Sequence, residues 1–222
     1  MMELWHCVSA RSFRPLWLIE ELGLECELRM LPFPPRSERR EYLNENPLGT
    51  VPLLVDGATR MSESAAICQY LAARRGSALN VAVSESEYGA FLNFLHFGEA
   101  TLTFPQTLVL RYRYFEPAER RQPQVAEDYA RWFLSRLRSL EGHLGESREF
   151  LCAGRFTAAD VSVGYALMLA SHLGFDVQFP PAVAAYWQRL RARPAFSRAL
   201  EREREAAIAQ GIDCTPSPDL RA

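Results

Sequence analysis

The sequence predicts an α/β domain followed by an all-helical domain, and two observations lead to this fold class. Up to residue 76, short apolar segments alternate with helix-like segments in the order βαβ and then ββα. From Ser84 on, strand signals vanish and apolar residues recur at helical spacing. The periodicity lapses between the two parts, so we expect domains at 1–76 and 84–210 and a flexible tail at 211–222.

The first domain begins with a strand and a helix. Residues 3–8 are short and mostly apolar, as in a strand, and residues 13–22 form a helix that Gly23 ends. Residues 27–31 form a second strand. The prolines of 32–35 end it, because proline has no N–H for a sheet ladder.

A hairpin and another helix complete this domain. The polar residues 36–45 predict a short, irregular helix. Two strands, 51–55 and 59–61, flank an Asp-Gly pair at 56–57 that supplies the positive φ values of a tight turn. Residues 65–75 have helix-forming composition.

The second domain reads as helices throughout. Phe91 to Leu102 indicate a long helix that Pro105 kinks or breaks. Thr157 and Asp160 have the spacing of a capping box at the start of a later helix, with a role in stability rather than chemistry. The other helices are expected at 125–144, 157–173, 181–192 and 195–209.

Composition excludes several classes of function. With 25 basic and 27 acidic residues the net charge is −2, which gives no electrostatic reason to expect nucleic acid or a membrane surface as a partner. Five cysteines without a CxxC pair argue against a disulfide scaffold and for a reducing compartment. No signal-peptide pattern and no bilayer-length apolar run is visible, so we expect a cytoplasmic protein.

The sequence supports neither a metal site nor a hydrolase active site. The four histidines lack ligand spacing, and His6 and Cys7 are adjacent in a strand, so their side chains face opposite ways. Ser9 lacks the G-x-S-x-G setting of a hydrolase nucleophile. We therefore expect no metal, and a buried, inert Cys7.

The polar break between the first strand and helix is a candidate anion site. A helix N-terminus carries partial positive charge, and Arg11 and Arg14 add formal charge. Such surroundings lower a thiol pKa, so Ser9 or Ser12 with the helix end suffices to stabilise a thiolate. The alternative is that Ser9 or Ser12 only caps the helix.

Two further pairs would suit a peptide-like ligand. If the bond between Val51 and Pro52 is cis, the Val51 backbone can pair with a bound peptide. Ser64 at a helix start can bind a carboxylate, and Glu63 beside it an ammonium group. The alternative for the second pair is a plain cap with a solvated glutamate.

These motifs, in this order, resemble the glutathione S-transferase superfamily, in a bacterial-type, serine-class-like form. The resemblance covers the chain to about residue 205. It rests on residues 9–24, on Asn-Pro-Leu-Gly-Thr-Val-Pro-Leu-Leu-Val-Asp-Gly at 46–57, on Glu-Ser-Ala-Ala-Ile at 63–67 and on Phe-Thr-Ala-Ala-Asp-Val at 156–161. It implies a thioredoxin-like N-terminal domain, an all-helical C-terminal domain and a homodimer.

The resemblance also implies roles for residues. Ser9 lies five residues before Arg14, where zeta- and tau-like members place the hydroxyl that bonds the glutathione sulfur; theta-like members place it at the position of Ala10, and Ser12 could serve instead. Positions 9–12 hold neither the cysteine of omega- or beta-like members nor the tyrosine of the tyrosine classes. The residues implied to bind glutathione are Arg11, Val51, Pro52, Glu63 and Ser64.

The expected function is a glutathione transferase, with glutathione as co-substrate and a small hydrophobic electrophile as second substrate. The electrophile is expected where the helical domain faces the sulfur, with Phe104, Tyr112 and Tyr114 as candidates, although aromatic residues in helices are more often core. Two alternatives share these sites: a non-catalytic binding or scaffold protein, and another glutathione-dependent enzyme such as an isomerase, peroxidase or dehalogenase.

Overall fold

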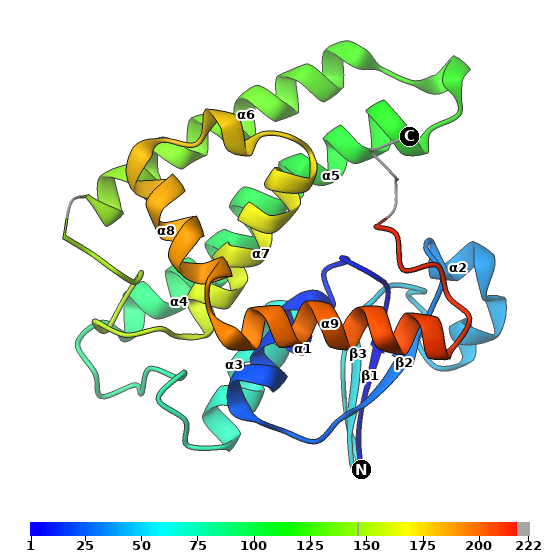
Figure 1. Ribbon diagram of the computed structural model, residues 1–222, viewed down its shortest axis with the longest axis horizontal. Helices are drawn as coiled ribbons and strands as arrows, with labels where there is room; N and C mark the ends of the chain where they lie inside the picture. The colour runs from blue at the N-terminus through cyan, green and yellow to red at the C-terminus, as the bar shows by residue number, and fades with distance from the viewer. Residues whose placement is uncertain (146, 217–222) are drawn as a thin grey trace. The chain divides into compact units, whose positions relative to one another are not determined.

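The computed structural model describes residues 1–145 and 147–216, which form two compact units (Figure 1). Of the described residues, the first unit contains 1–77 and 192–216, and the second contains 78–145 and 147–191. The break after Ser77 lies inside the predicted linker.

A four-stranded sheet forms the centre of the first unit, in the order β2-β1-β3-β4. Strand β1 pairs in parallel with β2 and antiparallel with β3, so that Leu4 lies between Leu28 and Leu54. The predicted hairpin joins β3 to β4, with Gly57 at φ 63°. The strands are β1 (Met2–His6), β2 (Glu27–Met30), β3 (Leu53–Asp56) and β4 (Thr59–Met61).

Helices cover this sheet at the predicted places. The first ends at Gly23, which is left-handed at φ 60°. The predicted irregular helix is a short α-helix followed by a 3₁₀ turn. The helices of this unit are α1 (Phe13–Leu22), α2 (Pro35–Glu38), η1 (Arg40–Asn44), α3 (Ser64–Arg74) and α9 (Pro194–Ala209).

The alternation along β1 divides the core in two. Met2, Leu4 and His6 point to one face and are buried. Trp5 points to the other face, where its ring lies 5.2 Å from the ring of Tyr42. Tyr42 packs there in a cluster with Cys7, Leu31 and Leu53.

Helix α9 belongs to the first unit and lies along α1 (Figure 1). The ring of Phe196 packs edge-on against Phe13 and Trp17, at 5.5 and 4.9 Å, and Arg193 pairs with Glu21 through two contacts of 2.6 and 2.9 Å. This differs from the expected domain at 84–210. An amphipathic pattern shows that a helix has an apolar face, but not which core that face joins.

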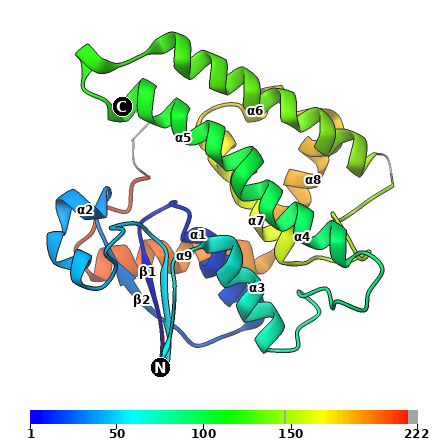
Figure 2. The ribbon, with the colours of Figure 1, turned by 180° about the vertical axis from the view of Figure 1, so that it is seen from behind.

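The second unit is helical, as predicted. The expected long helix kinked at Pro105 is a continuous helical run in which two π-helical stretches alternate with α-helix, and the run lies beside α6 (Figure 2). The first π stretch ends just before α5, whose second residue is Pro105. The elements are α4 (Tyr88–His96), η2 (Phe97–Thr103), α5 (Phe104–Leu110), η3 (Arg111–Phe115), η4 (Ala118–Arg120), α6 (Pro123–Leu144), α7 (Ala158–His172), η5 (Asp176–Gln178) and α8 (Pro181–Arg191).

The predicted capping box of α7 is confirmed. The Asp160 carboxylate accepts the Thr157 N–H at 2.8 Å, and it also accepts the Leu151 N–H at 3.0 Å and the Tyr186 hydroxyl at 2.8 Å. The box therefore joins the start of α7 to the preceding loop and to α8.

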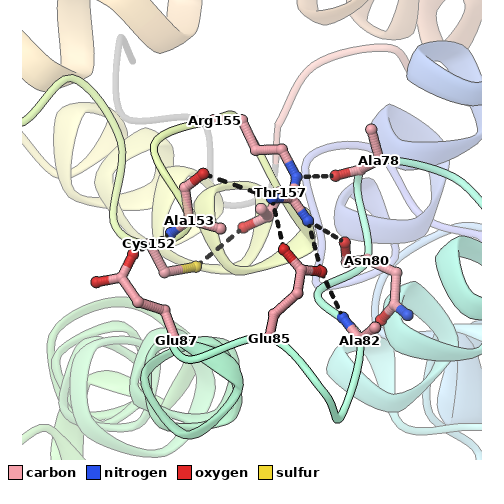
Figure 3. A network of polar contacts seen from close by, with 9 residues as sticks. All are labelled: Ala78, Asn80, Ala82, Glu85, Glu87, Cys152, Ala153, Arg155 and Thr157. Atoms are coloured by element: carbon pink, nitrogen blue, oxygen red, sulfur yellow. Dashed lines mark hydrogen bonds and ion pairs between the residues drawn. The ribbon is translucent and has the colours of Figure 1, made fainter.

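A polar network fixes the segment that opens the second unit (Figure 3). The Arg155 guanidinium forms a bidentate pair with Glu85, at 2.8 and 2.9 Å, and donates to the carbonyls of Ala78 and Asn80. A single arginine thus binds both the start of this unit and the loop before α4. No described helix is both long and apolar enough to cross a bilayer.

Candidate functional site

The turn between β1 and α1 presents Ser9 in a left-handed conformation, with φ 54°. Few residues other than glycine adopt this region, so the neighbouring contacts must hold it. The Ala10 N–H bonds the Cys7 carbonyl at 3.1 Å, which closes the turn behind the strand. Ser9 itself is half-buried.

Ser12 differs from Ser9 in exposure. Its side chain is completely buried, and its hydroxyl accepts the Cys7 N–H at 3.4 Å. Ser12 therefore supports the turn from inside.

The first N–H groups of α1 are already bonded. Phe13 N–H donates to Ala10 at 2.8 Å and Arg14 N–H to Arg11 at 3.3 Å, while Pro15 has no N–H. The turn itself thus takes these two N–H groups. The helix end contributes its dipole at this turn.

A carboxylate from α9 reaches Ser9. Glu203 is 4% exposed and accepts the Ser9 N–H at 2.8 Å, and the Ser9 hydroxyl donates to its other oxygen at 3.4 Å. The buried His6 lies 2.7 Å from Glu203 through Nε2. These three residues form one polar cluster at the end of β1.

A cavity of about 230 Å³ opens beside this turn. Ala10 and Arg11 form one wall and Gly49, Thr50 and Val51 another. Arg11 and Val51, both predicted to bind the ligand, therefore line one cavity, whereas Ser9 and Ser12 are not among its lining residues. The bond between Val51 and Pro52 is cis, as is that between Phe33 and Pro34. The remaining lining residues are Phe33, Pro34, Pro35 and Arg36.

The loop before Val51 is held by side chains. The Tyr42 hydroxyl and the Asn46 amide both donate to the Thr50 carbonyl at 2.8 Å, and the Asn46 carbonyl oxygen accepts the Leu48 N–H. Gly49 is left-handed at φ 61°, and a Cβ there would lie 2.7 Å from the Cβ of Arg36. The asparagine and glycine of this motif therefore set the backbone that leads into Val51.

The start of α3 holds the second predicted pair. Ser64 is buried, and its hydroxyl accepts a hydrogen bond from the buried guanidinium of Arg14 at 3.2 Å. The backbone ladder begins with Ile67 N–H to Glu63, so the N–H groups at 64–66 precede it. This helix end has a cation behind it, which suits a carboxylate. Glu63 is exposed beside it.

The cysteines near the site are unreactive by environment. Burial, and secondarily the charge of Glu203, raises the pKa of Cys7 to about 12, and burial raises that of Cys68 to about 12. Such thiols remain protonated near neutral pH. Over residues 1–145 and 147–216, no group of three His, Cys, Asp or Glu side chains could hold a metal ion.

The candidate electrophile residues lie in the second unit. Phe104 begins α5 and is 46% exposed, and Tyr112 and Tyr114 are half-buried within η3. All three are on one helical run and none is a fully buried core residue.

Two contributors escape sequence reasoning. The sequence suggests Arg14 only as a charge near the turn. In the structure its guanidinium also donates a hydrogen bond to the Ser64 hydroxyl. Glu203 is not among the predicted site residues. A signal for it exists: the buried face of α9 repeats at Ala199, Glu203 and Ala207, so a carboxylate occupies a core position.

The fold and this site define a class of protein: a thioredoxin-like domain with a ligand cavity at the end of its first strand, joined to a helical region. Comparison with known proteins gives the family. Residues 1–73 match the family model described as the glutathione S-transferase N-terminal domain. The chain is 25% identical to glutathione S-transferase 3 of Schizosaccharomyces pombe, over 91% of this chain and 88% of the relative.

Two solved structures are similar over nearly their whole length. A glutathione transferase from Methylococcus capsulatus has a TM-score of 0.80 at 25% identity, with 91% of this chain and 98% of that one covered. Ure2p5 from Phanerochaete chrysosporium, cocrystallised with 1-(S-glutathionyl)-2,4-dinitrobenzene, has a TM-score of 0.79 at 26% identity, with 94% and 96% covered. The chain is thus similar to glutathione S-transferases over about nine tenths of its length, and its residues 1–73 match the N-terminal domain of that family.

Proposed function

We propose that this protein is a glutathione transferase that joins the glutathione sulfur to a small hydrophobic electrophile. The observation that carries the proposal is the cavity in which Ala10 and Arg11, next to Ser9, face Val51. A ligand there lies beside the turn that carries Ser9 and beside the backbone of Val51. A cysteinyl thiol would bind near the Ser9 hydroxyl, and the peptide that carries it would bind along the Val51 backbone.

The γ-glutamyl end of glutathione is assigned to the start of α3. Its carboxylate would accept N–H groups at the helix end and the hydroxyl of Ser64, whose oxygen is already bonded by Arg14. Glu63 would hold the ammonium group. The Val51 backbone would pair with the cysteinyl residue, and Pro52 and Arg11 would complete the site.

The chemical step needs a thiolate. The thiol gives its proton to water, the Ser9 hydroxyl donates a hydrogen bond to the resulting sulfur anion, and the sulfur lone pair attacks an electrophilic carbon. A carbon–sulfur bond forms while the leaving group departs with its electron pair, or while an addition acceptor takes up a proton. Ser9 is favoured over Ser12 because Ser12 is completely buried.

The first experiment is to titrate the thiolate absorbance of glutathione at saturating protein. The bound thiol should have a pKa well below that of free glutathione, because a hydroxyl bond to a charged acceptor contributes about 1.5–3 kcal/mol. Binding without this change would favour the scaffold alternative, and failure to bind would overturn the assignment to glutathione.

Variants separate the roles. Ser9→Ala should raise the pKa of the bound thiol by about 1–2 with little loss of affinity, whereas Ser64→Ala and Glu63→Ala should mainly weaken binding. Ser135→Ala is the control, because that hydroxyl bonds the Trp132 carbonyl within α6. An unchanged pKa in Ser9→Ala would move the role to Ser12.

Turnover distinguishes the enzymes that share this site. A chlorodinitrobenzene is the first electrophile to try, because the relative from Phanerochaete chrysosporium was crystallised with the dinitrobenzene conjugate. Thiolate formation without conjugation would favour an isomerase, peroxidase or dehalogenase. Phe104→Ala, Tyr112→Phe and Tyr114→Phe then test the electrophile contacts through KM.

Assembly and location remain expectations. A homodimer predicts about twice the chain mass of 25.2 kDa in sedimentation experiments. A cytoplasmic location fits the free cysteines seen in the structure.

A further inference from the structure

Two members of the cluster at the end of β1, Glu203 and His6, are not used by the proposed mechanism. The cluster joins helix α9 to the turn that carries the predicted thiol-stabilising hydroxyl, and all three residues belong to the first unit. Glu203 is 4% exposed and His6 is fully buried. A buried carboxylate is costly unless it is hydrogen-bonded, so its partners define its state.

The two ring nitrogens of His6 lie in different surroundings. Nε2 lies 2.7 Å from a Glu203 oxygen, while Nδ1 is buried without a hydrogen-bond partner among residues 1–145 and 147–216. A neutral imidazole with its proton on Nε2 leaves only an unused acceptor, whereas the cation would bury an unpaired N–H. In the arrangement with the proton on Nε2, His6 donates to the Glu203 carboxylate at 2.7 Å.

An ionised carboxylate can only accept, which fixes the direction of its bonds with Ser9. One oxygen accepts the Ser9 N–H at 2.8 Å and thereby helps to hold the left-handed backbone at φ 54°. The other accepts the Ser9 hydroxyl hydrogen at 3.4 Å. In this arrangement the Ser9 oxygen turns a lone pair, not a hydrogen, toward other neighbours.

A second effect of Glu203 is seen at Cys7. Its charge adds to burial in raising the pKa of that thiol to about 12. Cys7 and His6 are the titratable groups at the end of β1 that adjoin the carboxylate. The same negative charge acts on any thiol that binds at the turn.

We propose that Glu203 is a positioning residue that holds the hydroxyl hydrogen of Ser9 and so opposes ionisation of a thiol bound at this turn. The inference rests on the proposed function. A thiolate needs the Ser9 O–H as donor, and Glu203 competes for the same hydrogen while it repels the negative sulfur. The carboxylate therefore holds the backbone of Ser9 in place and weakens the hydrogen bond that its hydroxyl can donate to a thiolate.

Glu203→Gln tests this with little change of shape. The glutamine oxygen can accept the His6 and Ser9 N–H groups, and its NH₂ group donates to the Ser9 oxygen. The Ser9 hydrogen is then free for the sulfur. The pKa of bound glutathione should fall by about 1 relative to the wild type, with affinity for S-methylglutathione unchanged. Glu201→Gln, on the exposed side of α9, should change neither quantity.

Two further variants keep the test decisive. Glu203→Asp retains the charge but withdraws it from the hydroxyl, so it should give a smaller fall. In a Ser9→Ala background the effect of Glu203→Gln should shrink to the part due to charge. An equal effect with and without the hydroxyl would overturn the competition for hydrogen, and an unchanged or raised pKa in Glu203→Gln would overturn the whole inference.

The result also separates this inference from the proposed function. If the wild type lowers the thiol pKa of glutathione and Glu203→Gln matches it, only the role of Glu203 fails. If the wild type binds neither glutathione nor S-methylglutathione, both proposals fail. Near-ultraviolet circular dichroism of each variant checks that its packing is retained.

Discussion

At the scale of single residues, burial decides which cysteines can react. Burial raises the pKa values of Cys7, Cys26 and Cys68 to about 12 and that of Cys152 to about 11. At pH 8 a thiol of pKa 12 has a thiolate fraction of about one in ten thousand. Cys214 is free and exposed.

A disulfide reagent at pH 8 should therefore label one thiol quickly in the native protein. Cys214→Ser should abolish this fast phase, while the other four thiols react only as the chain unfolds. The measurement is the number of thiols released per chain against time, and the same assay in guanidinium should count all five. Fast labelling that survives in Cys214→Ser would contradict the burial argument.

Gly49 is constrained both by its backbone and by its neighbours. Its φ of 61° disfavours other residues, and an added Cβ would lie 2.7 Å from Arg36 and 2.9 Å from Leu43. Gly57 has nearly the same φ, 63°, but nothing lies within 4 Å of its added Cβ. The two glycines therefore share the conformational cost and differ in the clash.

Gly49→Ala should thus lower stability more than Gly57→Ala, for which about 1 kcal/mol is expected from φ alone. Because Gly49 leads into Val51, its variant should also weaken glutathione binding. Urea unfolding and calorimetric titration measure the two effects. Equal losses of stability in the two variants would show that the loop yields to the extra methyl group.

At the scale of elements, the π-helical η2 packs closely on α7 through Gly98. A Cβ at this position would lie 2.5 Å from the carbonyl carbon and the hydroxyl oxygen of Ser162. That hydroxyl already bonds the Leu95 carbonyl at 2.7 Å, so it cannot move freely. A glycine is required at this position by close approach.

Gly98→Ala should destabilise the protein by about 2 kcal/mol or more, because backbone must shift to relieve the overlap. Gly142, within α6, is the matched control, since nothing lies within 4 Å of its added Cβ. Gly142→Ala should stabilise by about 0.5–1 kcal/mol through helix propensity. Thermal unfolding of both variants checks this, and a neutral Gly98→Ala would refute the close packing.

The cap of α7 predicts a dependence on pH. Burial raises the pKa of Asp160 from 3.8 to about 6, against the hydrogen bonds that lower it. Between pH 4 and 6 the folded chain thus keeps a proton that the unfolded chain has lost. The contribution of Asp160 to stability is therefore largest below pH 4 and falls as pH rises toward 6.

The free energy of unfolding of the wild type minus that of Asp160→Asn should accordingly fall by about 2 kcal/mol from pH 4 to pH 7. Urea unfolding at several pH values measures it. Asp128→Asn is a control of opposite sign, because Arg131 and Gln124 lower the pKa of that exposed carboxyl. A difference for Asp160→Asn that rises with pH would show that burial does not raise the pKa of this carboxyl.

At the scale of the whole molecule, the order of elements could be predicted from sequence because each has a local signal. Gly23 ends α1, an Asp-Gly pair turns the hairpin, and Thr157 with Asp160 begins α7. The π-helical stretches could not be predicted, since one extra residue per turn hardly alters an apolar periodicity. For the candidate site likewise, the sequence shows the motif residues but not the distant residues that contact them.

Partners distant in sequence leave the weakest signals. Ser9 and Glu203 are 194 residues apart, and only a glutamate on the buried face of α9 hints at their contact. The same distance explains why the sequence predicts α9 as part of the helical domain. Helical periodicity is a local property, whereas the choice of core depends on complementary surfaces such as Phe196 against Phe13 and Trp17.

Because α9 belongs to the first unit, it should control the stability of that unit. Phe196 is 5% exposed and packs on two aromatic rings of α1, so Phe196→Ala should cost about 3–5 kcal/mol. Leu200, on the same helix and 39% exposed, is the control, and Leu200→Ala should cost less than about 1 kcal/mol.

Hydrogen exchange measured by mass spectrometry shows which elements lose stability in the Phe196→Ala variant. In Phe196→Ala, exchange should accelerate in β1 and α1, which belong to the same unit as α9, more than in α6 and α7. Glutathione binding should weaken with it, since β1 and α1 carry the turn with Ser9. Acceleration spread evenly over α6 and α7 would mean that the two units unfold together, and that α9 does not stabilise the first unit selectively.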